Sequence, residues 1–156
     1  MIFKTRAAFG AIALTLSSFA AHAGDIEAGA SAFQSQCQTC HNVVDDGGEV
    51  LAGRANVRTG PNLYGVFGRE AGSYDGFRYG ASLVEVGEGG FVWSAEDMVP
   101  YLMDPTSFLR EKLDNNRARS QMSFRVRDEA TANDIIAFLS QFSEVEEEDA
   151  EEASGT

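Results

Sequence analysis

The residues best suited to chemistry are two cysteines and a histidine in the run Cys37-Gln38-Thr39-Cys40-His41. Two thiols about one helical turn apart can reach the two vinyl groups of a single porphyrin, and the adjacent imidazole can then bind the iron. Both sulfurs become thioethers, so neither remains for redox exchange. The run therefore predicts one covalently bound haem c, held by Cys37 and Cys40, with His41 as an axial iron ligand.

Three other interpretations of these residues fit less well. A thioredoxin-like dithiol lies at a strand-to-helix junction, whereas the surrounding sequence predicts helices and loops. A zinc site needs further cysteine or histidine ligands, and His41 is the only histidine after residue 23. A structural disulfide explains neither the adjacent histidine nor the glycine-rich loops that follow it.

The second axial position is expected to be taken by a methionine, because His22 belongs to a segment that we expect to be removed. Met98 and Met103 fall on a predicted helix, where a methionine usually fills the core. Met122 lies in a polar loop between helices and is the best placed of the three. The residues alone leave Met98 and Met103 as alternatives.

Composition divides the chain into three parts. Lys4 and Arg6 precede an apolar run that ends in Ala21-His22-Ala23, the layout of a cleaved secretory signal. The run is too short for a membrane anchor, so the mature chain is expected to be periplasmic, with no membrane span. We expect residues 1–23 to be the signal peptide, 24–143 the folded domain and 144–156 a disordered tail, which contains seven acidic residues.

The charge of the chain restricts its partners. The formal net charge is −12, and removal of Lys4 and Arg6 takes it to −14. Such a chain does not bind nucleic acid by neutralising phosphates. A solvated acidic surface instead favours solubility, and we expect a monomer.

Hydrophobic periodicity predicts helices at both ends of the domain. Asp25 can cap a helix that extends to Cys37, with apolar residues on one face. Gly29 lies inside it, either at a close helix crossing or incidentally. Near the end of the domain, Thr131 and Asp134 resemble a capping pair before an apolar stripe formed by Ile135, Phe138, Leu139 and Phe142.

The middle of the domain is less regular. Residues 45–90 are rich in glycine and turn residues, which predicts long loops that need a large planar cofactor to wrap. Ser94 and Asp97 predict a capped helix that runs to about Asp104 and ends at Pro105. Pro100 inside this helix is an anomaly, because proline removes a backbone donor.

The chain resembles a class I cytochrome c of the large, soluble bacterial type. The resemblance covers residues 24–143 and rests on motifs in a fixed order. They are Gly29 and Phe33, the Cys37–His41 run, Gly60-Pro61-Asn62-Leu63-Tyr64-Gly65 with Phe67-Gly68-Arg69, Gly76-Phe77-Arg78-Tyr79, Trp93, Tyr101-Leu102 with Asp104-Pro105, Met122 and Phe138. The fold that it implies is mainly α, with three to five helices and long loops around one haem.

The resemblance also implies roles for individual residues. Met122 would be the sixth iron ligand, and the Pro61 carbonyl would accept the free ring N–H of His41. Tyr79 and Trp93 would hydrogen-bond a buried haem propionate, whose charge Arg69 would balance. Tyr101 would lie beside the methionine ligand, and Gly29 and Phe138 would mark a crossing of the first and last helices.

The function implied is that of an electron carrier and not of an enzyme. The expected donor is a quinol-cytochrome c oxidoreductase. The expected acceptor is a terminal oxidase, a photosynthetic reaction centre or a denitrification enzyme. The alternatives are a haem peroxidase or gas-binding protein with an open sixth site, and an assembly subunit with a structural haem.

One departure from the family concerns docking charges. The family commonly has lysines around the exposed haem edge, whereas Lys112 is the only lysine after residue 23. Residues 110–127, called here the arginine segment, contain five arginines and Lys112 against Glu111 and Asp114, a local balance of +4. This segment predicts a positive face that steers acidic partners, with an ordinary solvated loop as the alternative.

Overall fold

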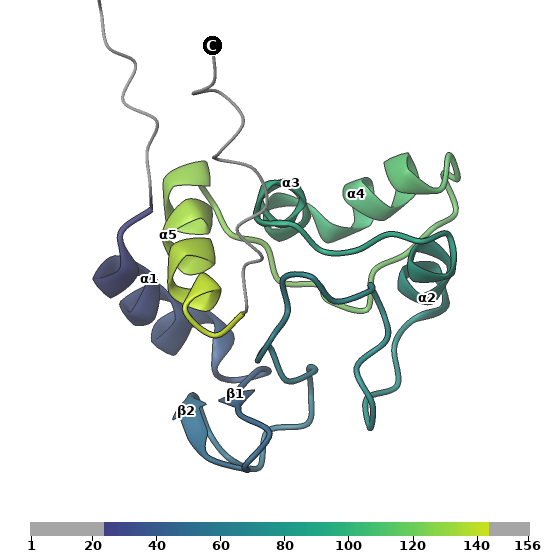
Figure 1. The fold of residues 1–156 in the computed structure, drawn as a ribbon. Coiled ribbons are helices and arrows are strands. Elements are labelled where there is room, and N and C mark those ends of the chain that lie inside the picture. Colours follow the sequence, from purple (N-terminus) through teal and green to yellow (C-terminus); the bar gives the residue numbers. More distant parts are fainter. Residues whose placement is uncertain (1–23, 144–156) are drawn as a thin grey trace, which may run out of the picture.

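The computed structural model describes residues 24–143. The expected signal peptide and acidic tail, residues 1–23 and 144–156, lie outside the described residues. The described part is mainly α-helical, as predicted, and has one small antiparallel hairpin (Figure 1). Its elements are α1 (Ile26–Ala32), the π-helical turn η1 (Phe33–Cys37), β1 (Val43–Val44), β2 (Val50–Ala52), α2 (Ala81–Glu88), α3 (Ala95–Met103), α4 (Pro105–Lys112) and α5 (Glu129–Ser140).

The first and last helices cross at close range, side by side in Figure 1. Asp25 caps α1 as predicted, because its carboxylate accepts the backbone N–H groups of Glu27 and Ala28. A β-carbon on Gly29 would collide with the Asp134 carbonyl of α5 and lie 2.8 Å from the Phe138 β-carbon. Gly29 therefore serves the crossing, where the Phe138 ring packs 5.4 Å from that of Phe33.

The predicted start of the last helix was wrong by one turn. Asp128 is the N-cap of α5, and its carboxylate accepts the N–H of Thr131 at 2.8 Å and the Thr131 hydroxyl at 3.0 Å. Thr131 is thus inside the helix. Asp134 instead accepts the backbone N–H of Asp25 at 2.7 Å, which ties the start of α1 to α5.

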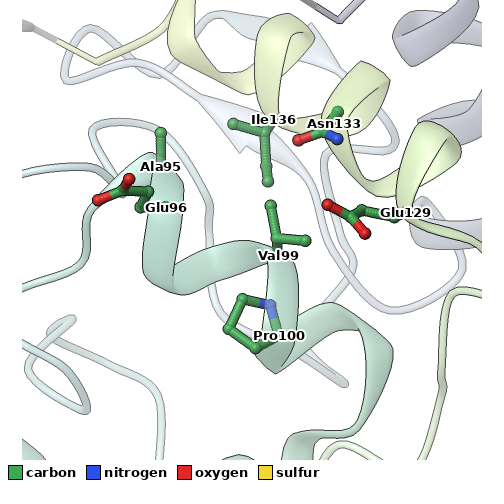
Figure 2. Close-up of a pocket in the computed structure, with 7 residues that line it drawn as sticks. All are labelled: Ala95, Glu96, Val99, Pro100, Glu129, Asn133 and Ile136. Carbon is green, nitrogen blue, oxygen red and sulfur yellow. The ribbon is translucent and has the colours of Figure 1, made fainter. Parts of the chain in front are cut away.

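The helix predicted after Ser94 is confirmed as α3. The Ser94 hydroxyl accepts the Asp97 N–H at 3.0 Å and donates to its carboxylate at 2.7 Å. Pro100 has no backbone N–H, so the Glu96 carbonyl lacks its helical partner. Both residues lie on the exposed side of the helix, where water can take the place of that partner. Figure 2 shows the Pro100 ring at the edge of a groove between α3 and α5.

Pro105 ends α3 as predicted, but it also begins α4, which the sequence analysis did not predict. The Asp104 carboxylate accepts the Ser107 N–H at 3.0 Å and caps the new helix. Proline suits the first helical position because its N–H would have no partner there.

Residues 45–90 contain more regular structure than predicted. The helix α2 and the strand β2 lie within them, and β2 pairs with β1, which precedes this range. Helix α2 has no side-chain cap, and it contains Gly87, whose absent β-carbon lets the Ala71 carbonyl approach. The remaining chain in this range is loop, and its apolar residues Leu63, Tyr64 and Phe67 pack against the core.

Helices α1, α3, α4 and α5 share one apolar core. Phe33, Leu109 and Ile135 are its large, almost fully enclosed side chains. Among residues 24–143, no helix is long and apolar enough to cross a membrane.

We predict that Gly29→Ala destabilises the domain by about 1–3 kcal/mol, because the new methyl group must push α1 away from the α5 backbone. Denaturant-induced unfolding would measure this loss. Gly47→Ala is the control, since its β-carbon would meet only the Asp45 side chain at 3.3 Å. Equal stability of the two variants would contradict a close crossing at Gly29.

Candidate haem site

One large cavity, about 600 Å³ in volume, lies between the helices and the loops of residues 59–80 and 120–124. All of the site residues expected from the sequence line it: Cys37, Cys40, His41, Pro61, Arg69, Tyr79, Trp93, Tyr101 and Met122. They come from separate segments of the chain. The fold therefore brings together in one place every residue that was expected to contact the haem or its iron.

The cysteines and the histidine lie on a tight turn at the end of the first helix. The α1 helix widens into the π-helical turn η1, and the N–H groups of Cys40 and His41 donate to the Cys37 carbonyl at 3.0 and 2.9 Å. Both thiols are free and partly buried. Burial, and secondarily the neighbouring Cys40, raises the pKa of Cys37 to about 11, so this thiol is protonated at neutral pH.

The imidazole of His41 has a fixed orientation. Its Nδ1 lies 2.9 Å from the Pro61 carbonyl oxygen, which fits an N–H donated from this nitrogen. Burial lowers the pKa of His41, and this hydrogen bond opposes the shift. The neutral ring thus keeps its Nε2 lone pair for a metal.

Gly60 forms the wall behind this ring. A β-carbon there would lie 2.6 Å from His41 Nδ1 and 2.8 Å from Nε2. The Gly60 N–H also donates to the Cys40 carbonyl at 2.7 Å, which holds the loop against the haem motif. No separate role was predicted for Gly60, although its place directly before Pro61 was the available signal.

Met122 is held by hydrogen bonds of its own loop. Its N–H donates to the Ser120 hydroxyl at 3.1 Å, and the Ser120 N–H donates to Thr106 of α4 at 3.3 Å. Burial raises the pKa of Tyr101, while a hydrogen bond with Ser120 acts in the opposite direction. Met98 of α3 is buried and also lines the cavity, whereas Met103 is not among its lining residues.

Polar groups gather at another part of the cavity wall. The Arg69 guanidinium donates to the Asn62 carbonyl at 3.2 Å, and burial lowers the pKa of Arg69. Burial raises the pKa of Tyr79, with the positive charge of Arg69 opposing this. Trp93 is only 7% exposed and packs its ring 4.8 Å from that of Tyr101.

The rest of the lining is largely apolar. Val66, Leu83 and Phe124 had no sequence signal, whereas Leu63, Phe77 and Leu102 belong to the family motifs, and Ile135 and Leu139 to the apolar stripe of the last helix. A second, smaller hollow of about 430 Å³ lies between α3 and α5, where Val99 and Ile136 point toward one another (Figure 2). It contains none of the predicted site residues.

The main cavity fits a haem by its chemistry. It offers apolar walls for a porphyrin, two thiols beside an oriented imidazole, a methionine sulfur, and a cationic and hydroxyl-bearing region suited to carboxylates. A mainly helical domain with this arrangement defines a c-type haem protein.

Known proteins support that class. Cytochrome c2 of Rhodovulum adriaticum is 52% identical over 124 residues, which are 80% of this chain and 97% of that protein. Cytochrome c-551 of Roseobacter denitrificans is 46% identical over 140 residues, 89% of this chain and 96% of that protein. The crystal structure of cytochrome c2 from Rhodobacter sphaeroides matches with a TM-score of 0.73 at 50% identity, over 77% of this chain and 97% of that one. No family model matches.

The chain therefore belongs to the class I soluble cytochromes c, the family of the cytochromes c2 and c-550. The family and the fold expected from the sequence are both confirmed. The cofactor is one covalently bound haem c, and the family is one of electron carriers.

We predict that Gly60→Ala displaces the His41 ring and weakens its bond to Pro61, with a loss of about 1–3 kcal/mol in unfolding free energy. Faster solvent exchange of the His41 Nδ1 proton, seen by NMR, would report the displacement. Gly80→Ala is the matched control, because Gly80 also lines the cavity but its β-carbon would meet Gln121 at an ordinary 3.6 Å. An unchanged proton exchange rate in Gly60→Ala would contradict the prediction.

Proposed function

We propose that this chain is a periplasmic single-haem carrier that shuttles one electron between membrane-bound complexes and is not an enzyme. The observation that carries the proposal is that one cavity is lined both by the oriented imidazole of His41 and by Met122. When bound, the haem supplies an iron that alternates between the ferric and ferrous states. With both axial positions occupied by the chain, no position is open for a substrate.

The proposed roles of the motif residues follow from their geometry. Cys37 and Cys40 attach the porphyrin, and His41 binds the iron through Nε2 because Nδ1 is engaged by Pro61. Met122 is the sixth ligand. Its backbone N–H is bonded to the Ser120 hydroxyl, which restrains the loop that presents this side chain to the cavity.

The polar part of the cavity is proposed to hold the haem propionates. Tyr79 and Trp93 donate hydrogen bonds to a propionate, and Arg69 balances its charge. Tyr101 lies beside the methionine ligand, an arrangement supported by the place of Tyr101, Ser120 and Met122 in the lining of the same cavity. Removing these groups from water strengthens their interaction with a carboxylate.

We also propose export and processing. Residues 1–23 are a cleaved signal peptide, 24–143 the cytochrome domain and 144–156 an acidic disordered tail. The basic start and the Ala21-His22-Ala23 pattern support this division, as does the packing of Gly24 against the α5 backbone at Asn133.

The proposed donor is a quinol-cytochrome c oxidoreductase, and the proposed acceptor a terminal oxidase, a photosynthetic reaction centre or a denitrification enzyme.

The arginine segment is the proposed docking surface for these partners, but it is less positive than its sequence suggests. Lys112 pairs with Asp97 at 2.9 Å and lies over the Phe91 ring, and Arg125 pairs with Asp104 at 3.2 Å. Arg117, Arg119 and Arg127 remain as exposed charges without a carboxylate partner in the part of the chain described.

Optical spectra with and without carbon monoxide test the closed iron. We expect a c-type spectrum that carbon monoxide does not shift, with a methionine-to-iron charge-transfer band in the oxidised protein. Met122→Ala should abolish this band and admit carbon monoxide, whereas Met103→Leu should change neither. Carbon monoxide binding to the unmodified protein would overturn the carrier proposal, and an unchanged Met122→Ala spectrum would move the ligand to Met98 or Met103.

Reaction rates with an acidic redox partner test the docking charges. We expect the bimolecular rate to fall as salt rises, because opposite charges steer the encounter. Arg117→Glu should lower the rate at low ionic strength and flatten its salt dependence. Ser31→Asp on α1, exposed and outside the cavity lining, is the control. A rate that does not depend on salt would contradict steering.

A further inference from the structure

Arg69 is a cavity-lining cation whose charge has no carboxylate partner within residues 24–143, where the ion pairs are Lys112–Asp97 and Arg125–Asp104. A partly buried guanidinium needs other groups to hold it in one place. The Asn62 carbonyl accepts one of its N–H groups at 3.2 Å. One hydrogen bond leaves the guanidinium free to swing about that contact.

The face of Tyr74 supplies the second contact. The Cζ atom of Arg69 lies 5.0 Å from the centre of the Tyr74 ring, a distance at which the ring attracts a cation. Tyr74 is partly buried, and it is absent from the residues that line the cavity. Tyr74 therefore contacts Arg69 without lining the cavity itself.

The Tyr74 ring is itself fixed by its surroundings. Its hydroxyl accepts a long, 3.4 Å hydrogen bond from the Asn62 side chain, which also exchanges bonds of 2.7 and 2.9 Å with the Val44 backbone. At the start of the same loop, the Ser73 hydroxyl donates to the Glu70 carbonyl at 2.7 Å. Asn62 thus joins β1, Arg69 and Tyr74 in one network.

We propose that Tyr74 is a positioning residue for electron transfer, which holds the Arg69 guanidinium at the haem propionates and thereby raises the reduction potential. The ferrous state carries one positive charge fewer than the ferric state, so a fixed cation nearby favours reduction. The inference rests on the proposed haem site and adds a residue outside the cavity that sets the position of the charge inside it.

Reduction potentials of the purified holoprotein test the proposal. Tyr74→Leu removes the ring face and should lower the potential to a value between those of the wild type and Arg69→Gln. Tyr74→Phe is the matched control, because it keeps the ring and loses only the long bond from Asn62. Its potential should equal that of the wild type. In an Arg69→Gln background, Tyr74→Leu should cause no further shift, because it acts through Arg69.

A second readout separates positioning from a general loss of structure. In Tyr74→Leu the pH at which the potential begins to fall should move upward, because a less tightly held cation no longer lowers the pKa of the propionate. The Arg69 Nε–H should also exchange faster with solvent by NMR.

The outcomes distinguish the two proposals. If Arg69→Gln leaves the potential unchanged, the proposed role of Arg69 at the haem fails and the Tyr74 inference fails with it. If Arg69→Gln lowers the potential while Tyr74→Leu does not, the site survives and the Tyr74 inference alone is overturned. An additive shift in the double variant would also overturn it.

Discussion

The structure depends on the close contact between α1 and α5. Gly29 presents no side chain, so the two helix backbones approach until the Asp134 carbonyl and Phe138 occupy the space that a β-carbon would need. This contact, reinforced by the bond from Asp25 to Asp134, fixes the end of α1 relative to the core. Because Cys37, Cys40 and His41 follow directly on that helix, their position depends on the crossing. Closely packed interiors transmit such constraints with little loss.

The rest of the domain completes the cavity, one side of which is formed by the turn that carries Cys37, Cys40 and His41. Residues 59–80 contribute its loops, and polar backbone groups of these loops are satisfied by specific bonds, such as those from the Gly60 N–H to the Cys40 carbonyl and from the Leu63 N–H to the Asn42 carbonyl. No buried side-chain nitrogen or oxygen among the described residues lacks a hydrogen-bond partner. A covalently attached porphyrin supplies a further apolar surface against which the loops can pack. The packing of the long loops thus depends on the cofactor.

The basic side chains of the domain differ in their partners, and tertiary contacts decide which of them pair with a carboxylate. Lys112 and Arg125 belong to a segment with a local charge of +4, yet Asp97 and Asp104, from earlier in the chain, pair with them. Arg69, by contrast, lines the cavity and has no carboxylate partner among the described residues. Its contacts are the Asn62 carbonyl and the face of the Tyr74 ring. A charge count along the sequence records neither outcome.

The sequence by itself determined the haem motif, the family, the starts of α1 and α3 and the end of α3, because these depend on short-range chemistry. The thiols of Cys37 and Cys40 are recognised together with the adjacent His41, and Asp25 and Ser94 cap helices through bonds within four residues. Local patterns failed for α2, α4 and the start of α5. Helix α2 lacks a cap, Pro105 both ends one helix and begins another, and Thr131 resembled a cap that Asp128 provides. The resemblance implied a crossing at Gly29, which the structure confirms; only the tertiary structure showed that Gly60 backs the His41 ring and that Arg69 contacts the Tyr74 ring. These contacts join residues whose meeting depends on the packing of the whole chain.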